Sequence, residues 1–157
     1  MKNVYLILFV VIFFSCNKNT LDKKFYPDGR LNYTIENKGD YNQILDYEGN
    51  KSPIMELKFK KDHFIDTIYY FDTDNPHFFV IDSLKGPYFY GTYYLMYNKQ
   101  DLKEKGTYRY KRNLDFRKTI SSIQPFGTHF IYDKNGNIKE KIKSIIVNDT
   151  VYTKTEL

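Results

Sequence analysis

Apolar and polar side chains alternate along most of the chain that follows residue 25. Leu31, Tyr33 and Ile35 are separated by single polar residues, and the same alternation returns over Met55–Lys60. A period of two residues is typical of a strand that buries one of its faces. Because no stretch after Cys16 keeps a helical period, we predict an all-β domain.

Short groups of turn-forming residues separate the predicted strands. These groups are Pro27–Gly29, Glu48–Asn50, Asp72–Pro76, Ser83–Pro87, Asn98–Asp101, Pro125–Gly127, Asn135-Gly136 and Asn148-Asp149. The Asn135-Gly136 pair predicts a type I′ hairpin turn, in which both central residues take positive φ. We expect the basic segment Lys111–Arg117 to be a longer loop. The pattern therefore predicts an antiparallel meander of hairpins, either an open repeat sheet or a small barrel.

The first sixteen residues have a different pattern. Val4–Phe14 is an apolar run of eleven residues, preceded by Lys2 and followed by Ser15. A helix that spans a membrane needs about 20 apolar residues, so this run is too short. A basic residue, an apolar run of about 7–15 residues and a small residue at the cleavage site are typical of a secretory signal peptide. We predict that residues 1–15 are a signal peptide; a buried strand or short helix of the fold is the alternative interpretation.

The residues Phe13-Phe14-Ser15-Cys16 resemble the lipobox of a bacterial lipoprotein, in the looser form found in Bacteroidetes-type bacteria. The resemblance implies that Cys16 becomes the first residue of the mature protein and carries a diacylglycerol thioether and an N-acyl chain such as palmitate. One acyl chain binds a membrane only marginally, at about 0.8 kcal/mol for each buried methylene group, whereas three chains would anchor the protein stably. Cys16 is the only cysteine of the chain. Once its sulfur is acylated, it can neither form a disulfide bond nor act as a catalytic nucleophile.

The chain is thus predicted to have three segments. Residues 1–15 are the signal peptide, residues 16–24 are the lipidated cysteine and its tether, and residues 25–157 form a single all-β domain with one hydrophobic core. Lipoproteins exported to the surface of Bacteroidetes cells often carry acidic residues just after the cysteine, and Asn17–Thr20 has none. The resemblance therefore implies a cell-envelope protein that is anchored to the outer membrane and faces the periplasm.

The charge of the chain restricts its partners. It carries 24 basic and 19 acidic residues, and the mild excess of positive charge is spread along the sequence. We interpret this excess as a solvated surface. Nucleic acid is not an expected partner in the envelope, although a basic protein can bind it elsewhere.

Aromatic residues supply the candidate binding surface. The 16 tyrosines and 13 phenylalanines favour strands. Tyrosine combines a large apolar ring with a polar tip, which suits sugars or protein partners. Our candidates for an aromatic binding face are Tyr88, Tyr90, Tyr94 and Tyr108. The alternative is that these tyrosines only pack the sheet.

Two segments of the chain repeat without a gap at an offset of 36 residues. Gly91–Met96 aligns with Gly127–Tyr132, and Leu102–Lys105 aligns with Ile138–Lys141. These units resemble the MORN-variant repeat of bacterial antitoxin-like proteins, whose pattern is Gly-x-aromatic-x-x-Tyr, a turn, and Gly-x-apolar-x-Glu. The resemblance implies β-hairpins that stack into a sheet, and it indicates architecture rather than activity.

The sequence contains no strong motif for catalysis or for a metal site. His63, His77 and His129 fall in separate predicted strands without the short spacing of metal ligands. Nucleophile elbows, glycine-rich phosphate loops and Cys-x-x-Cys are absent from the sequence. We therefore predict no cofactor, no metal site and no enzymatic activity.

These features together predict a lipid-anchored envelope protein that acts as a non-catalytic binding or scaffolding module. Its expected partners are the membrane, through the lipid anchor, and a protein or a glycan. Two alternatives stay open. One is an immunity or antitoxin-like protein that neutralises a protein partner through its β surface, and the other is a small barrel that carries an apolar ligand in an enclosed cavity.

Overall fold

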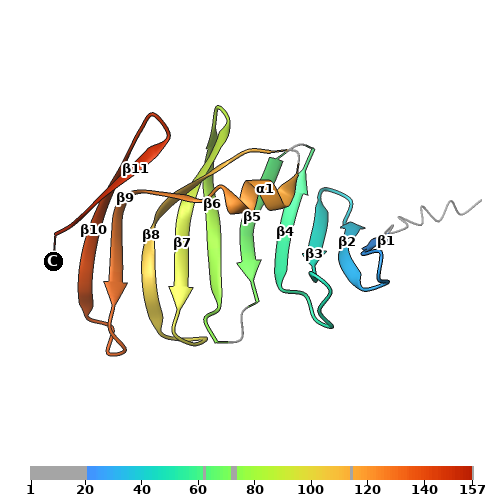
Figure 1. Ribbon diagram of the computed structural model, residues 1–157, viewed down its shortest axis with the longest axis horizontal. Coiled ribbons are helices and arrows are strands. Elements are labelled where there is room, and N and C mark those ends of the chain that lie inside the picture. The colour runs from blue at the N-terminus through green and yellow to red at the C-terminus, as the bar shows by residue number, and fades with distance from the viewer. Residues whose placement is uncertain (1–20, 62, 72–73, 114, 157) are drawn as a thin grey trace, which may run out of the picture.

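A computed structural model describes residues 21–61, 63–71, 74–113 and 115–156 (Figure 1). The predicted signal peptide and Cys16 lie outside these residues. Within them, eleven strands form one antiparallel sheet, so the predicted all-β meander is confirmed. No helix in these segments is long and apolar enough to cross a membrane.

The order of the strands in the sheet is their order in the chain, and each strand pairs with the next. The strands are β1 (Leu21–Phe25), β2 (Leu31–Asn37), β3 (Asn42–Asp46), β4 (Met55–Lys60), β5 (His63–Tyr70), β6 (His77–Lys85), β7 (Tyr88–Met96), β8 (Leu102–Lys111), β9 (Gln124–Tyr132), β10 (Ile138–Val147) and β11 (Thr150–Thr155). β1 and β11 lie at opposite ends of the sheet (Figure 1), which is open and not closed into a barrel. Of the two predicted architectures, the open sheet is therefore the correct one.

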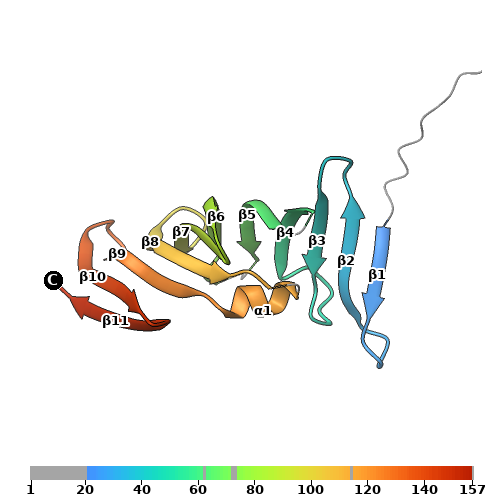
Figure 2. The ribbon, with the colours of Figure 1, turned by 90° about the horizontal axis from the view of Figure 1, so that it is seen from above.

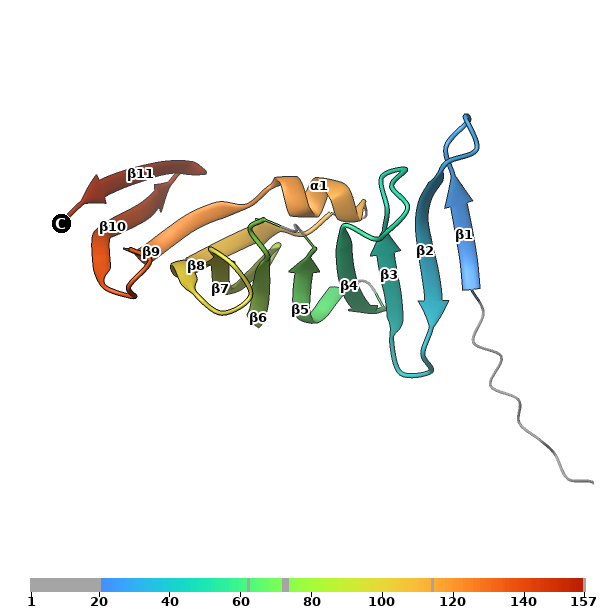
Figure 3. The same ribbon diagram turned by 90° about the horizontal axis from the view of Figure 1, so that it is seen from below.

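The two faces of this sheet are covered differently. Partners on neighbouring strands project from the same face, so the register assigns each side chain to a face. One face, which we call the helix face, carries the hydrophobic core and is covered by a short helix, α1 (Phe116–Ser121), as Figures 2 and 3 show. The buried core residues are Ile44, Met55, Leu57, Ile68, Phe79, Phe89 and Tyr110. We call the opposite side of the sheet the open face.

Helix α1 corrects two expectations, the basic loop over Lys111–Arg117 and the absence of helix after Cys16. Asp115 caps the helix, because its carboxylate accepts a hydrogen bond of 3.0 Å from the backbone N–H of Arg117. Phe116 and Ile120, one turn apart, both pack against the core. A helix of six residues is too short to show a sustained period, and its stability comes from tertiary packing.

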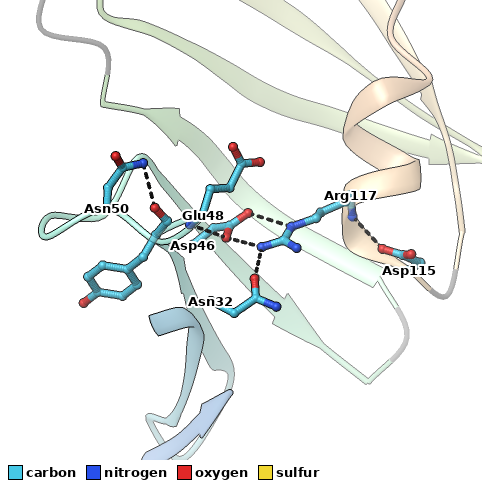
Figure 4. Close-up of polar contacts among 7 residues, drawn as sticks. Asn32, Asp46, Glu48, Asn50, Asp115 and Arg117 are labelled. Atoms are coloured by element: carbon cyan, nitrogen blue, oxygen red, sulfur yellow. Dashed lines mark hydrogen bonds and ion pairs between the residues drawn. The ribbon is translucent and has the colours of Figure 1, made fainter. Parts of the chain in front are cut away.

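A buried ion pair holds α1 on the sheet (Figure 4). The Arg117 Nε donates to Oδ2 of Asp46 at 3.1 Å, and its Nη2 donates to the other oxygen of the same carboxylate and to Oδ1 of Asn32. Asp46 lies on β3 and is 0 % exposed, whereas the Arg117 side chain is 32 % exposed. A fully buried carboxylate requires such a partner, so this contact ties the helix to Asp46 of β3 and Asn32 of β2.

The Asn135-Gly136 turn differs from its prediction, because only Gly136 takes positive φ, at 82°. The Asp133 carboxylate stabilises this loop by accepting hydrogen bonds from the backbone N–H groups of Asn135 and Asn137, at 2.8 and 2.9 Å. At Asn148-Asp149, in contrast, both residues have positive φ, 48° and 60°. The type I′ combination of φ angles therefore occurs at the β10–β11 turn and not at the β9–β10 turn.

The sheet begins four residues earlier than expected, because β1 includes residues 21–24, which the sequence assigns to the tether. All five residues of β1 are exposed, and Lys23 and Lys24 pair with Thr34 and Tyr33 of β2. An exposed edge strand needs no apolar alternation, so its sequence resembles that of a polar linker. Lysines on such an edge also discourage pairing with another sheet.

The internal repeat is visible in the hairpins. Met96 pairs with Leu102 in β7–β8, and Tyr132 pairs with Ile138 in β9–β10, at the same offset of 36 residues. Leu95 with Glu104 and Ile131 with Glu140 are the next matched pairs, and both hairpins have an irregularity between these two pairs. The two aligned segments therefore form hairpins of the same register, side by side in the sheet.

Candidate functional site

The structure divides the four candidate tyrosines between the two faces. Tyr88, Tyr90 and Tyr94 lie at alternate positions of β7 and project from the open face. Tyr108 on β8 pairs with Gly91, which has the opposite parity in β7, so it projects from the helix face. Its hydroxyl donates a hydrogen bond to Oε1 of Glu104 there. The expectation of one surface formed by all four tyrosines is thus wrong for Tyr108.

A row of paired residues crosses the open face from β5 to β10, perpendicular to the strands. We call it the aromatic row; its members are Tyr69, Phe78, Tyr94, Lys105, Phe130 and Lys141. Strands in a sheet lie about 4.8 Å apart, so the row extends over about 24 Å. Only Tyr94 of these six is predicted from the sequence, because the pairing of strands cannot be read from the alternation of one strand.

The rings of the aromatic row stand side by side. The centroids of Tyr69 and Phe78 are 6.1 Å apart, and those of Phe78 and Tyr94 are 4.8 Å apart with an angle of 16° between the rings. The Lys105 Nζ lies 5.4 Å from the centroid of Tyr94, within the range of a cation–π interaction. Tyr69 is 40 % exposed, and Lys105 is also exposed. The row is therefore a ridge of apolar rings with a cation beside it.

Positive charge gathers beside the aromatic row on the last strands. Lys143 of β10 is paired with Lys154 of β11, and both are exposed. Two like charges directly opposite each other destabilise a strand pair. Glu156 offsets part of this charge: its carboxylate lies 3.0 Å from Nζ of Lys141, and the Lys141 ammonium, with Lys143 and Lys154 nearby, holds the pKa of Glu156 below its usual value. This end of the open face suits an anionic ligand.

A shallow hollow of about 420 Å³ lies next to these lysines, lined among others by Tyr90, Arg109 and Phe126. The rings of Tyr90 and Phe126 meet edge to face with centroids 5.3 Å apart. Arg109 is held rigidly, because its Nε donates to Oε1 of Gln124 at 2.9 Å and its Nη2 donates to Oδ1 of Asp149 at 2.8 Å. The hollow thus presents fixed aromatic and guanidinium groups, the residue types that are most frequent at binding hot spots.

The turn between β10 and β11 contacts Tyr88 and Arg109 on the open face. Tyr88 donates a hydrogen bond of 2.8 Å to the Asp149 carboxylate, and its ring lies 3.9 Å from the guanidinium carbon of Arg109. These hydrogen bonds hold the pKa of Asp149 below its usual value, with Tyr88 as the larger cause and Arg109 as the next. Tyr88 therefore fastens the turn onto the open face and is less available to a partner than Tyr94.

The helix face brings together a carboxylate and a histidine. Oε1 of Glu104 lies 3.8 Å from Nδ1 of His129, and the neighbouring His129 ring and the Tyr108 hydroxyl hold the pKa of Glu104 below its usual value, although burial opposes them. His129 is 3 % exposed, and its Nε2 has no hydrogen-bond partner; the same is true of Oγ of the buried Ser144. Neither the hollow beside Tyr90 nor the pocket under α1 is lined by Glu104 or His129. Within this pair the His129 side chain is buried, whereas the Glu104 side chain is 23 % exposed.

The other two histidines lie on different strands, β5 and β6. His63 lines a pocket of about 330 Å³ under α1. His77 stacks on Tyr70 with centroids 4.3 Å apart, and its Nδ1 lies 3.0 Å from the carbonyl oxygen of Asn75. In the described part of the chain, no three His, Cys, Asp or Glu side chains come close enough to hold a metal ion.

The comparisons with known proteins add no relative. No model of a known protein family matches the chain, and neither a curated protein nor a solved structure matches it. A proposal for the function therefore depends on the sequence and the geometry of this chain.

Proposed function

We propose that this is a lipid-anchored protein of the cell envelope that acts as a non-catalytic binding module. The observation that carries the proposal is the aromatic row on the open face. Aromatic rings from four strands, β5, β6, β7 and β9, lie along one line of the sheet, on the face opposite α1. The lipid anchor is supported by the sequence of residues 1–16 alone, with Cys16 as the acylated residue.

The partner that fits the open face best is an extended acidic glycan. The row is about 24 Å long and has no deep cavity, which favours a chain-like ligand over a small molecule. Tyrosine rings and hydroxyls match the apolar and polar groups of sugar rings. Lys105 and the pair Lys143 and Lys154 supply positive charge along the same face, which favours carboxylated or phosphorylated sugars.

A second candidate function is the neutralisation of a protein partner, as in an immunity or antitoxin-like protein. The hollow lined by Tyr90, Arg109 and Phe126 supports it, because rigid aromatic and arginine side chains act as anchors in protein interfaces. Such a partner would bind in a stoichiometric complex, whereas a glycan would bind with an affinity that depends on chain length.

Binding to immobilised acidic and neutral polysaccharides tests the first proposal. We expect the full-length protein to bind the acidic polymer, and the double substitution Lys105→Glu with Lys143→Glu to weaken binding at least tenfold. Lys99→Glu with Lys134→Glu is the matched control, because it changes the same charge at exposed turn positions. Equal binding by both double variants would refute the role of the open face. Recovery of one specific protein from detergent-solubilised membranes, lost in Arg109→Ala, would favour the second candidate.

The anchor is tested separately by fractionation of cells that express the whole chain. We expect the wild type in the membrane fraction, with the mass of an acylated chain that begins at Cys16, and Cys16→Ser in the unprocessed form. A soluble, unacylated mature chain would refute the anchor without affecting the binding proposal.

A further inference from the structure

The last strand of the sheet has a free edge. β11 pairs with β10 and with no other strand among the described residues. The backbone N–H of Glu156 donates to the carbonyl oxygen of Lys141 at 2.8 Å, so the even-numbered residues of this segment direct their N–H and C=O groups at β10. The backbone groups of the odd-numbered residues, Val151, Thr153 and Thr155, therefore point outward from the free edge of the sheet (Figure 1).

The free edge at β11 suits pairing with another strand, whereas the free edge at β1 is protected against it. β1 carries three charged residues, Asp22, Lys23 and Lys24, and its pairing is irregular after Lys24. Charges and irregularities are the usual features that prevent edge strands from pairing. β11, with the sequence Thr-Val-Tyr-Thr-Lys-Thr, has a single charge, no proline and mostly β-branched or aromatic residues, which favour strands. The β11 edge is therefore the one to which a further strand can be added.

β11 complements a second copy of itself in the antiparallel direction. With Thr153 opposite Thr153 of the second copy, the outward backbone groups of both strands meet in hydrogen-bonded pairs, and Val151 pairs with Thr155 on each side of the centre. Threonine opposite threonine is a favourable cross-strand pair. The two-fold axis of such a dimer is perpendicular to the sheet, so the open faces of both copies lie on the same side of one continuous sheet.

The same register matches the side chains of the open face. Tyr152 and Lys154 are the neighbours of Thr153, so each Tyr152 lies opposite Lys154 of the other copy. In the single chain Lys154 is opposite the like charge of Lys143, and Tyr152, which is 56 % exposed, is opposite Ile145, which is 55 % exposed. Contact between the ring and the ammonium covers part of this exposed apolar surface and gives Lys154 a cation–π partner.

We propose that β11 is a dimerisation edge, through which two copies of the chain join by antiparallel β11 strands centred on Thr153. An isologous contact of this kind closes at two subunits, whereas β11 against the β1 edge would generate an open fibre. The dimer presents two aromatic rows on one side of an extended sheet. The inference depends on the geometry of β11 and not on the proposed glycan binding or the lipid anchor.

Disulfide crosslinking of the full-length chain in cells tests the register. Thr153→Cys places two thiols at the two-fold axis, where the Cα atoms of paired residues are about 5.5 Å apart, within the range that a disulfide can bridge. We expect this variant to form a covalent dimer on oxidation. Thr155→Cys is the matched control, because in this register its two copies lie about 14 Å apart. The unaltered chain controls for Cys16.

Sedimentation of the purified full-length protein in a non-ionic detergent measures the affinity, and we expect a dimer for the wild type. Thr153→Pro removes an N–H that points away from β10, so it should weaken the dimer by roughly tenfold or more while the chain stays folded. Tyr152→Lys should weaken the dimer by placing two ammonium groups opposite each other. The addition of Lys154→Glu to Tyr152→Lys should restore it, because the opposed charges then attract. Circular dichroism establishes that each variant is folded.

The dimer is refuted if the wild type is monomeric at every concentration, or if Thr153→Cys and Thr155→Cys crosslink equally. It is also refuted if Lys154→Glu fails to restore the association that Tyr152→Lys weakens. A series of oligomers larger than two would indicate pairing of β11 with β1 and would equally overturn the proposal. None of these results bears on glycan binding, which is measured separately on immobilised polysaccharides.

Discussion

The ion pair between Arg117 and Asp46 gives the sharpest prediction about stability. The Asp46 carboxylate is 0 % exposed, and three hydrogen bonds reach it: two from the guanidinium of Arg117 and one, at 3.4 Å, from the backbone N–H of Glu48. Arg117→Ala removes the two stronger donors and leaves the carboxylate buried. Because the partners are 71 residues apart in the chain, the substitution also loosens α1 from β3.

The expected cost can be estimated from burial. Removing one partner of a fully buried ion pair costs about 3–5 kcal/mol. The Arg117 side chain is 32 % exposed, so water can partly replace it. We therefore expect Arg117→Ala to lower the free energy of unfolding by about 2–3 kcal/mol. For a domain of this size that corresponds to a decrease in Tm of about 4–12 °C. Arg117→Lys, which keeps the charge but loses the fork of donors, should cost about half as much.

Urea unfolding followed by circular dichroism measures these differences. Lys118→Ala is the matched control, because Lys118 is an exposed neighbour on the same helix and should change stability by less than about 0.5 kcal/mol. Asp46→Ala combined with Arg117→Ala completes a double-mutant cycle. The double variant should be more stable than the sum of the single effects predicts, by about 1 kcal/mol or more, since it leaves no unpaired buried charge.

A cost for Arg117→Ala no larger than that of Lys118→Ala would refute this reasoning. It would mean that the apolar contacts of Phe116 and Ile120 alone hold α1 on the sheet. Additive effects in the cycle would equally contradict a direct interaction between Asp46 and Arg117, because two residues in contact are expected to couple.

Two further predictions concern His129 and its neighbours Gly106 and Glu104 on the helix face. A Cβ atom at Gly106 would lie 2.2 Å from Nδ1 of His129, so Gly106→Ala should destabilise the fold by about 1–3 kcal/mol in urea unfolding, and less when it is combined with His129→Ala. The pKa of Glu104 is lowered from 4.5 by His129 and Tyr108, so its contribution to stability is present above about pH 4.5 and is lost as the pH falls through the lower folded value. Glu104→Gln should therefore flatten the acid limb of the stability curve; an unchanged acid limb would contradict this assignment.

The candidate site shows how far alternation along a strand can be read. The period of two over β7 correctly places Tyr88, Tyr90 and Tyr94 on one face, since parity within a strand is a local property. It cannot relate Tyr108 to them, because the relative parity of two strands is set by their register, which puts Tyr108 opposite Gly91. For the same reason Tyr69, Phe78 and Phe130 join Tyr94 only when the strands are paired.

The sequence by itself determined most of the strands and most of the turns between them, because φ preferences and the two-residue period act within a few neighbouring residues. The tertiary structure alone decided what lies on each face. α1 is stable as a helix because Phe116 packs against the core and Arg117 forms an ion pair with the buried carboxylate of Asp46, on a strand 71 residues away in the chain. The pocket under α1 likewise exists only where β5 parts from β6, a separation that no local pattern specifies.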